Sequence, residues 1–80
     1  MNSYLMVYDR EHGQLLELKE FSSQAAAMRR RFVLERQHAE DDQIEIVVLM
    51  AESESLLRKT HARYFTSLGD LLSNMSARLA

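Results

Sequence analysis

The sequence lacks cysteine and contains only two glycines, Gly13 and Gly69, which lie far apart. Without cysteine the chain has neither a disulfide nor a thiolate nucleophile, and zinc could be held only by histidine and carboxylate side chains. Phosphate-binding loops need several neighbouring glycines, and no serine lies in a G-x-S-x-G motif. The sequence therefore contains no diagnostic catalytic motif and no diagnostic cofactor-binding motif. We therefore expect a protein that is not an enzyme and that holds no cofactor and no metal.

The sequence also has little net charge and no long apolar run. Ten Lys and Arg side chains against twelve Asp and Glu give a formal net charge of -2, so no overall positive field attracts nucleic acid or an anionic membrane. No apolar run approaches the roughly 20 residues that cross a bilayer. The N-terminus lacks the basic and apolar regions of an export signal. We therefore expect a cytoplasmic protein without a membrane partner.

Residue patterns predict three strands and two helices within one small domain, residues 1–80. Aromatic and β-branched residues predict strands at residues 3–9, 14–21 and 43–50. Alternation in the second strand predicts that Leu16 and Leu18 share one face. A run of good helix formers predicts a first helix that extends to about residue 38. Its cap is Ser22 or Ser23, and its sheet-facing stripe consists of Ala25, Met28, Phe32 and Ala39.

The second helix is predicted to begin at Ser53, whose hydroxyl can cap its first turn. Its apolar stripe continues to the C-terminus, which favours one long helix. Gly69 and the Ser67-x-x-Asp70 pattern instead favour a break near residues 66–69. In either version residues 67–80 form a C-terminal helical extension.

These elements give the order β-β-α-β-α, which is an α+β fold. The first helix connects the second strand to the third, and this crossover should place the helix over the sheet. The third strand then lies beside the first, so the predicted strand order is 2-1-3. We expect both helices to cover the same face of this sheet.

The opposite face of the sheet would then be exposed and apolar. An apolar patch of several hundred Å² on a soluble protein marks an interface, so either the C-terminal segment or a second copy of the chain should cover it. The last helix also has apolar residues at seven-residue spacing, which is typical of helix pairing. We predict an interaction or regulatory module that forms a homodimer or binds another protein. The predicted interface residues are Tyr4, Met6, Tyr8, Val47, Leu49, Leu57, Tyr64, Leu68, Leu71 and Met75.

Two alternative functions depend on polar side chains. A nucleic-acid-binding surface would use Arg29, Arg30, Arg36, Arg58 and Arg63. Consecutive helical residues point about 100° apart, so the run of arginines at 29–31 fans around its helix, and the sequence disfavours this partner. A metal-assisted enzyme would use a polar cluster that the topology brings toward one end of the sheet, although its spacing matches no metal motif. The members of this cluster are His12, His38, Asp41, Asp42 and His61.

Overall fold

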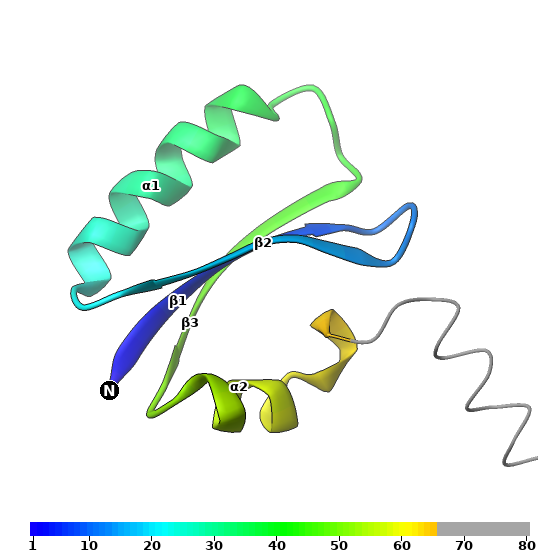
Figure 1. Cartoon of the computed structure of the whole chain (residues 1–80). Helices are drawn as coiled ribbons and strands as arrows, with labels where there is room; N and C mark the ends of the chain where they lie inside the picture. Colours follow the sequence, from blue (N-terminus) through cyan, green and yellow to red (C-terminus); the bar gives the residue numbers. More distant parts are fainter. Residues whose placement is uncertain (66–80) are drawn as a thin grey trace, which may run out of the picture.

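The computed structural model describes residues 1–65, which form a three-stranded sheet with one helix on each face (Figure 1). Its elements are β1 (Asn2–Asp9), β2 (Gln14–Phe21), α1 (Gln24–Gln37), β3 (Ile44–Ala51), α2 (Glu54–Thr60) and the 3-10 turn η1 (Ala62–Tyr64). The strands lie in the order β2-β1-β3, and β1 is antiparallel to both neighbours. The predicted α+β class and the predicted strand order are therefore confirmed.

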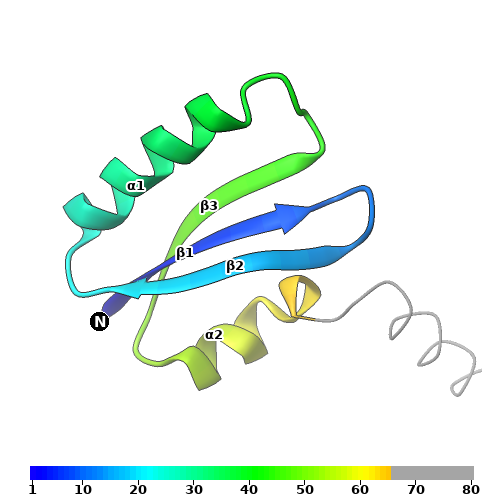
Figure 2. The same cartoon turned by 45° about the horizontal axis from the view of Figure 1, so that its top comes forward.

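The two helices lie on opposite faces of the sheet, so the expectation that both cover one face is wrong (Figure 2). On the α1 face, Leu5 and Val7 of β1 form a core with Leu34 and Ile46. The core on the α2 face consists of Tyr4, Met6, Tyr8, Leu57 and Tyr64. The physical reason lies in β1, which carries apolar side chains on both sides and needs a cover on each. Helix α2 and η1 cover this second face, for which we expected the C-terminal segment or a second copy of the chain.

Helix α1 contacts the sheet with a different side from the predicted one. Its buried residues are Ala27 and Leu34, whereas Phe32 is 55% exposed. Ala25 and Ala39 are exposed as well, and Met28 is half-buried. Ala27 is small enough to let the helix approach the strands closely, and Leu34 supplies the volume that fills the core. Arginines and apolar residues are spread around this helix, so its periodicity selects no unique buried face.

Helix α2 is shorter than either predicted version. It ends at Thr60, and the backbone N–H of His61 donates to Leu57 O at 2.9 Å before the chain enters η1. The Thr60 hydroxyl donates to Leu56 O at 3.0 Å, a side-chain bond that competes with helix continuation. The prediction of one continuous helix is therefore wrong, and α2 ends before the break predicted near residues 66–69. The proposed extension at residues 67–80 lies outside the described residues.

A β-bulge interrupts the pairing of β2 with β1. Val7 pairs with Glu17 and Tyr8 pairs with Leu15, which leaves Leu16 without a partner on β1. The extra residue reverses the alternation, so Leu15 and Leu18 both pack against the core on the α2 face. The prediction that Leu16 shares a face with Leu18 is therefore wrong, because strict alternation does not allow for a bulge.

Candidate functional site

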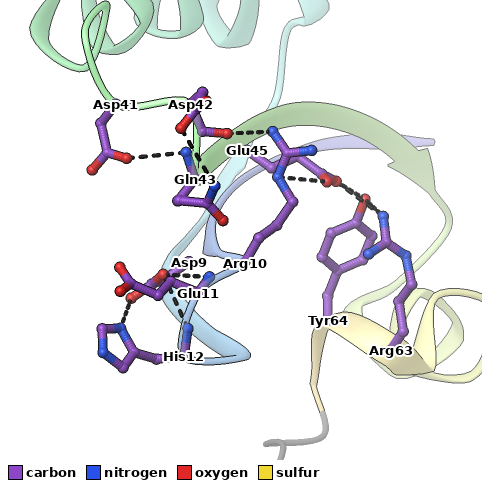
Figure 3. A network of polar contacts seen from close by, with 10 residues as sticks. All are labelled: Asp9, Arg10, Glu11, His12, Asp41, Asp42, Gln43, Glu45, Arg63 and Tyr64. Atoms are coloured by element: carbon purple, nitrogen blue, oxygen red, sulfur yellow. Dashed lines mark hydrogen bonds and ion pairs between the residues drawn. The ribbon is translucent and has the colours of Figure 1, made fainter.

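Three segments meet at one end of the sheet around the carboxylate of Glu45 (Figure 3). Arg63 Nη2 donates to Glu45 Oε2 at 3.0 Å, and the Tyr64 hydroxyl donates to the same oxygen. Arg10 Nε lies 3.9 Å from Glu45 Oε1. The Glu45 side chain is only 19% exposed, and a carboxylate at this depth requires such partners. This network ties the turn after β1, the strand β3 and the turn η1 together.

Aromatic and cationic side chains extend the network into the core. The rings of Tyr8 and Tyr64 meet edge to face with centroids 5.2 Å apart. The Arg63 guanidinium carbon lies 4.1 Å from the Tyr64 ring centroid. Burial raises the pKa of the Tyr64 hydroxyl, and its hydrogen bond to Glu45 raises this pKa further. The phenol therefore stays protonated and acts as a donor that holds η1 on β3.

The turn between β1 and β2 is organised by Asp9. Its Oδ1 accepts from the backbone N–H groups of Glu11 at 2.9 Å and His12 at 3.3 Å, and its Oδ2 lies 2.7 Å from His12 Nδ1. The hydrogen bond between the two side chains lowers the pKa of Asp9 and raises that of His12. Gly13 closes the turn at φ 63, a conformation that glycine adopts at little cost. These bonds are those of a well-formed Asx turn.

The same turn contains side chains that could hold a metal ion. Ligand atoms of Asp9, Glu11 and His12 lie within 4.8 Å of one another. Glu11 and His12 are exposed, and the contacts of Asp9 are explained by closure of the turn. Within residues 1–65 neither His38 nor His61 belongs to such a group.

The predicted polar cluster is brought together only in part. The turn that contains His12 does meet the connector that contains Asp41 and Asp42, but the contacts are made by Arg10. Its backbone N–H donates to Gln43 O at 2.8 Å, and its Nη2 donates to Asp42 O at 2.9 Å.

The other two histidines serve as helix ends. His38 is the C-cap residue of α1 and His61 is that of α2, and each caps its helix through its backbone N–H. The Nδ1 of His61 lies 2.9 Å from Thr60 Oγ1. Within residues 1–65, the three histidines therefore do not meet at one site, as the metal-assisted enzyme would require.

Most of the predicted interface residues are used inside this chain. Five of them form the core on the α2 face, namely Tyr4, Met6, Tyr8, Leu57 and Tyr64. Val47 and Leu49 are half-buried against the same core. The premise that this face of the sheet is exposed is therefore wrong. Leu68, Leu71 and Met75 lie outside the described residues.

The predicted arginine surface is divided by the sheet. Arg29, Arg30 and Arg36 belong to α1, whereas Arg58 and Arg63 belong to α2 and η1 on the opposite side. Arg58 pairs with Glu54 at 3.6 Å, and its guanidinium carbon lies 4.6 Å from the Phe65 ring centroid. Arg29, Arg30 and Arg36 form no ion pair with any residue in the described part of the chain. The five side chains therefore do not make one surface.

Glu45 is the member of the site for which the sequence did contain a signal. It is the only charged residue in the otherwise apolar strand β3, and a single carboxylate in such a setting requires cationic or hydroxyl partners. The identities of those partners depend on the placement of α2 on the opposite face, which the residue patterns do not indicate.

No family model, curated protein or solved structure matches the chain in the comparisons with known proteins. Within residues 1–65, no helix combines the length and the hydrophobicity that a membrane span requires.

Proposed function

We propose that this chain is a non-catalytic protein-interaction module of the cytoplasm that associates with itself. The observation that supports the proposal is a difference between the two outer edges of the sheet. Figure 2 shows β2 and β3 as the outer strands on either side of β1. An outer strand offers free backbone donors and acceptors to another chain unless the sequence protects it.

The outer edge of β2 carries two kinds of such protection. A bulge interrupts its ladder at Leu16, and charged side chains follow at Glu17, Lys19 and Glu20. Bulges and charges at an edge oppose the addition of another strand. We therefore expect β2 to remain the outer strand.

The outer edge of β3 lacks these protections. Its pairing with β1 runs without a register shift from Ile44 to Ala51. The strand contains no proline and no lysine, and Glu45, its one charged residue, is already engaged with Arg63 and Tyr64. Long, regular and apolar edges of this kind add strands from other chains. This edge, the side of β3 that faces away from β1, is hereafter called the β3 edge.

Light scattering after size exclusion tests the proposal on the full chain. Over about 1 to 100 μM, a range that covers common working affinities, we expect the mass to rise from monomer to dimer. Met50→Lys should abolish the dimer, because lysine on an edge opposes pairing and Met50 is already 48% exposed. Leu16→Lys on the edge of β2 is the matched control, because Leu16 is 54% exposed. A strict monomer at about 100 μM would contradict self-association.

A second candidate, nucleic-acid binding, is favoured by one observation on α1. The helix contains four arginines and one glutamate, and Phe32 is exposed beside them. Arginines can contact phosphates while an aromatic ring stacks on a base. This candidate predicts a low-salt gel shift with single-stranded DNA that the double variant Arg29→Gln/Arg36→Gln loses and that Arg58→Gln keeps. No shift at low salt would exclude it.

A further inference from the structure

One backbone hydrogen bond determines which residues of β3 face outward. Arg10 N–H donates to Gln43 O at 2.8 Å, directly beyond the pair of Asp9 with Ile44. Bonded and non-bonded pairs alternate along an antiparallel ladder. The residues of β3 that bond to β1 are therefore Glu45, Val47 and Leu49. The N–H and C=O groups of Ile46, Val48 and Met50 point away from β1.

Ile44 agrees with this assignment. It belongs to the outward set, and its N–H donates to Asp41 O at 3.4 Å in the preceding turn instead of bonding to β1. In the described part of the chain, the N–H groups of Ile46, Val48 and Met50 have no such acceptor. Within residues 1–65, no backbone hydrogen bond outside the β1 ladder reaches residues 45–51. The β3 edge therefore presents three consecutive outward sites for strand pairing.

We infer that the β3 edge pairs antiparallel with the β3 edge of a second copy, with Val48 on the two-fold axis. This inference rests on the proposed self-association. Two three-stranded sheets would then become one continuous six-stranded sheet. In this register Val48 exchanges both bonds with Val48 of the partner subunit, and Ile46 exchanges both with Met50 of the partner subunit. All three outward N–H groups of each copy thereby gain an acceptor.

The side chains across this seam are compatible. Val48 meets its own symmetry mate, and Ile46 meets Met50 of the partner subunit, on the face that carries α1. On the other face, Val47 meets Leu49 of the partner subunit. Neighbouring apolar side chains on adjacent strands stabilise a sheet. The two Glu45 side chains stay apart, because each lies opposite the small Ala51 of the partner subunit.

Two registers are neighbours of this one. A register with Leu49 on the axis would pair Ile46 with residue 52, which lies beyond the end of β3 at Ala51. The other neighbouring register places Val47 on the axis. It sets the charged Glu45 directly opposite the large apolar Leu49 of the partner subunit, whereas the inferred register sets Glu45 opposite the small Ala51 of the partner subunit. It also needs the Ile44 N–H for its outermost pair, and that group is already bonded to Asp41 O. The register with Val48 on the axis uses only N–H groups that have no acceptor within residues 1–65, and it is the one we infer.

Amide hydrogen exchange followed by NMR tests the inference on the unmodified chain. The amides of Glu45, Val47 and Leu49 are bonded to β1 and should be protected in monomer and dimer alike. The amides of Ile46, Val48 and residue 50 should exchange about 100-fold more slowly in a concentrated sample than in monomeric Met50→Lys. The alternation along one strand supplies the internal control.

The outcomes separate this inference from the proposed function. A dimer in light scattering with these three protected amides supports both. A dimer in which they exchange rapidly overturns the β3 seam and leaves self-association standing. A strict monomer overturns both. Protection of the three amides in a monomer would assign the β3 edge to a segment of the same chain and would also overturn the inference.

Discussion

The Tyr64 hydroxyl donates a hydrogen bond to the carboxylate of Glu45, and this contact fastens the turn after α2 to β3. The same carboxylate accepts from Arg63, and the Tyr64 ring packs edge to face on Tyr8. One tyrosine thus joins the polar network at the end of the sheet to the apolar core on the α2 face. The packing of α2 and η1 on that face therefore depends on the contacts of Tyr64 as well as on the packing of the helix.

Tyr64→Phe should therefore destabilise the fold although it keeps the ring. Loss of a hydrogen bond to a charged, largely buried acceptor costs about 1–2 kcal/mol, which lowers the melting temperature by roughly 4–8 °C per kcal/mol in a domain of this size. Thermal unfolding measures the change. Tyr8→Phe is the control, because the Tyr8 hydroxyl makes no hydrogen bond within residues 1–65. Equal losses in the two variants would contradict a specific role for the Tyr64 hydroxyl.

Packing of α2 on the second face can be tested with two adjacent leucines. Leu57 is fully buried in the core with Tyr4 and Met6, whereas Leu56 is 42% exposed. Leu57→Ala should lower the free energy of unfolding by about 2–5 kcal/mol, because it leaves a cavity in the core. Leu56→Ala should change it by less than about 0.5 kcal/mol, as is usual at the surface. Urea unfolding of both variants checks the difference, and equal costs would contradict this packing.

The strands and their order were predictable because their signals are local. The residues of β1 and β3 are rich in aromatic and β-branched side chains, and one crossover helix leaves few ways to place β3. The side occupied by α2 was not predictable in the same way, because both faces of β1 are apolar and either could receive Leu57. The buried face of α1 was also missed, because close packing selected Ala27 over the larger Phe32.

The site was less predictable than the fold. The histidines were candidate ligands because of their residue type, yet His38 and His61 lie at the C-terminal ends of α1 and α2. Its working contacts are made by Arg10 and Tyr64, which resemble ordinary surface and core residues in the sequence. Glu45 alone carried a usable signal, since a single carboxylate in an apolar strand must find partners.

The pairing of Asp9 with His12 predicts a pH-dependent contribution to stability. The pKa of His12 is raised, so its contribution is complete below its ordinary value of 6.5 and is lost as the pH rises through the folded pKa. The pKa of Asp9 is lowered, so its contribution is complete above its ordinary value of 3.8 and is lost as the pH falls through the folded pKa. The pair should therefore stabilise the turn most between these two ordinary values.

NMR titration of the His12 ring measures this coupling directly. In Asp9→Asn the pKa of His12 should fall, because the hydrogen-bonding carboxylate that raises it is gone. Glu20→Gln, at the far end of β2, should leave the His12 titration unchanged. An unchanged His12 pKa in Asp9→Asn would show that the contact does not persist in solution.

The absence of cysteine allows the proposed seam to be tested by cross-linking without background. In the inferred register Val48 lies directly opposite Val48 of the partner subunit, at a Cα separation of about 5.5 Å that a disulfide can span. The two Val47 residues lie diagonally across the seam at roughly 7–8 Å, which is beyond the usual reach. Under mild oxidation Val48→Cys should therefore form a covalent dimer on a non-reducing gel, and Val47→Cys should not. Faster cross-linking of Val47→Cys would instead support the register with Val47 on the axis, because that register brings the two Val47 residues face to face.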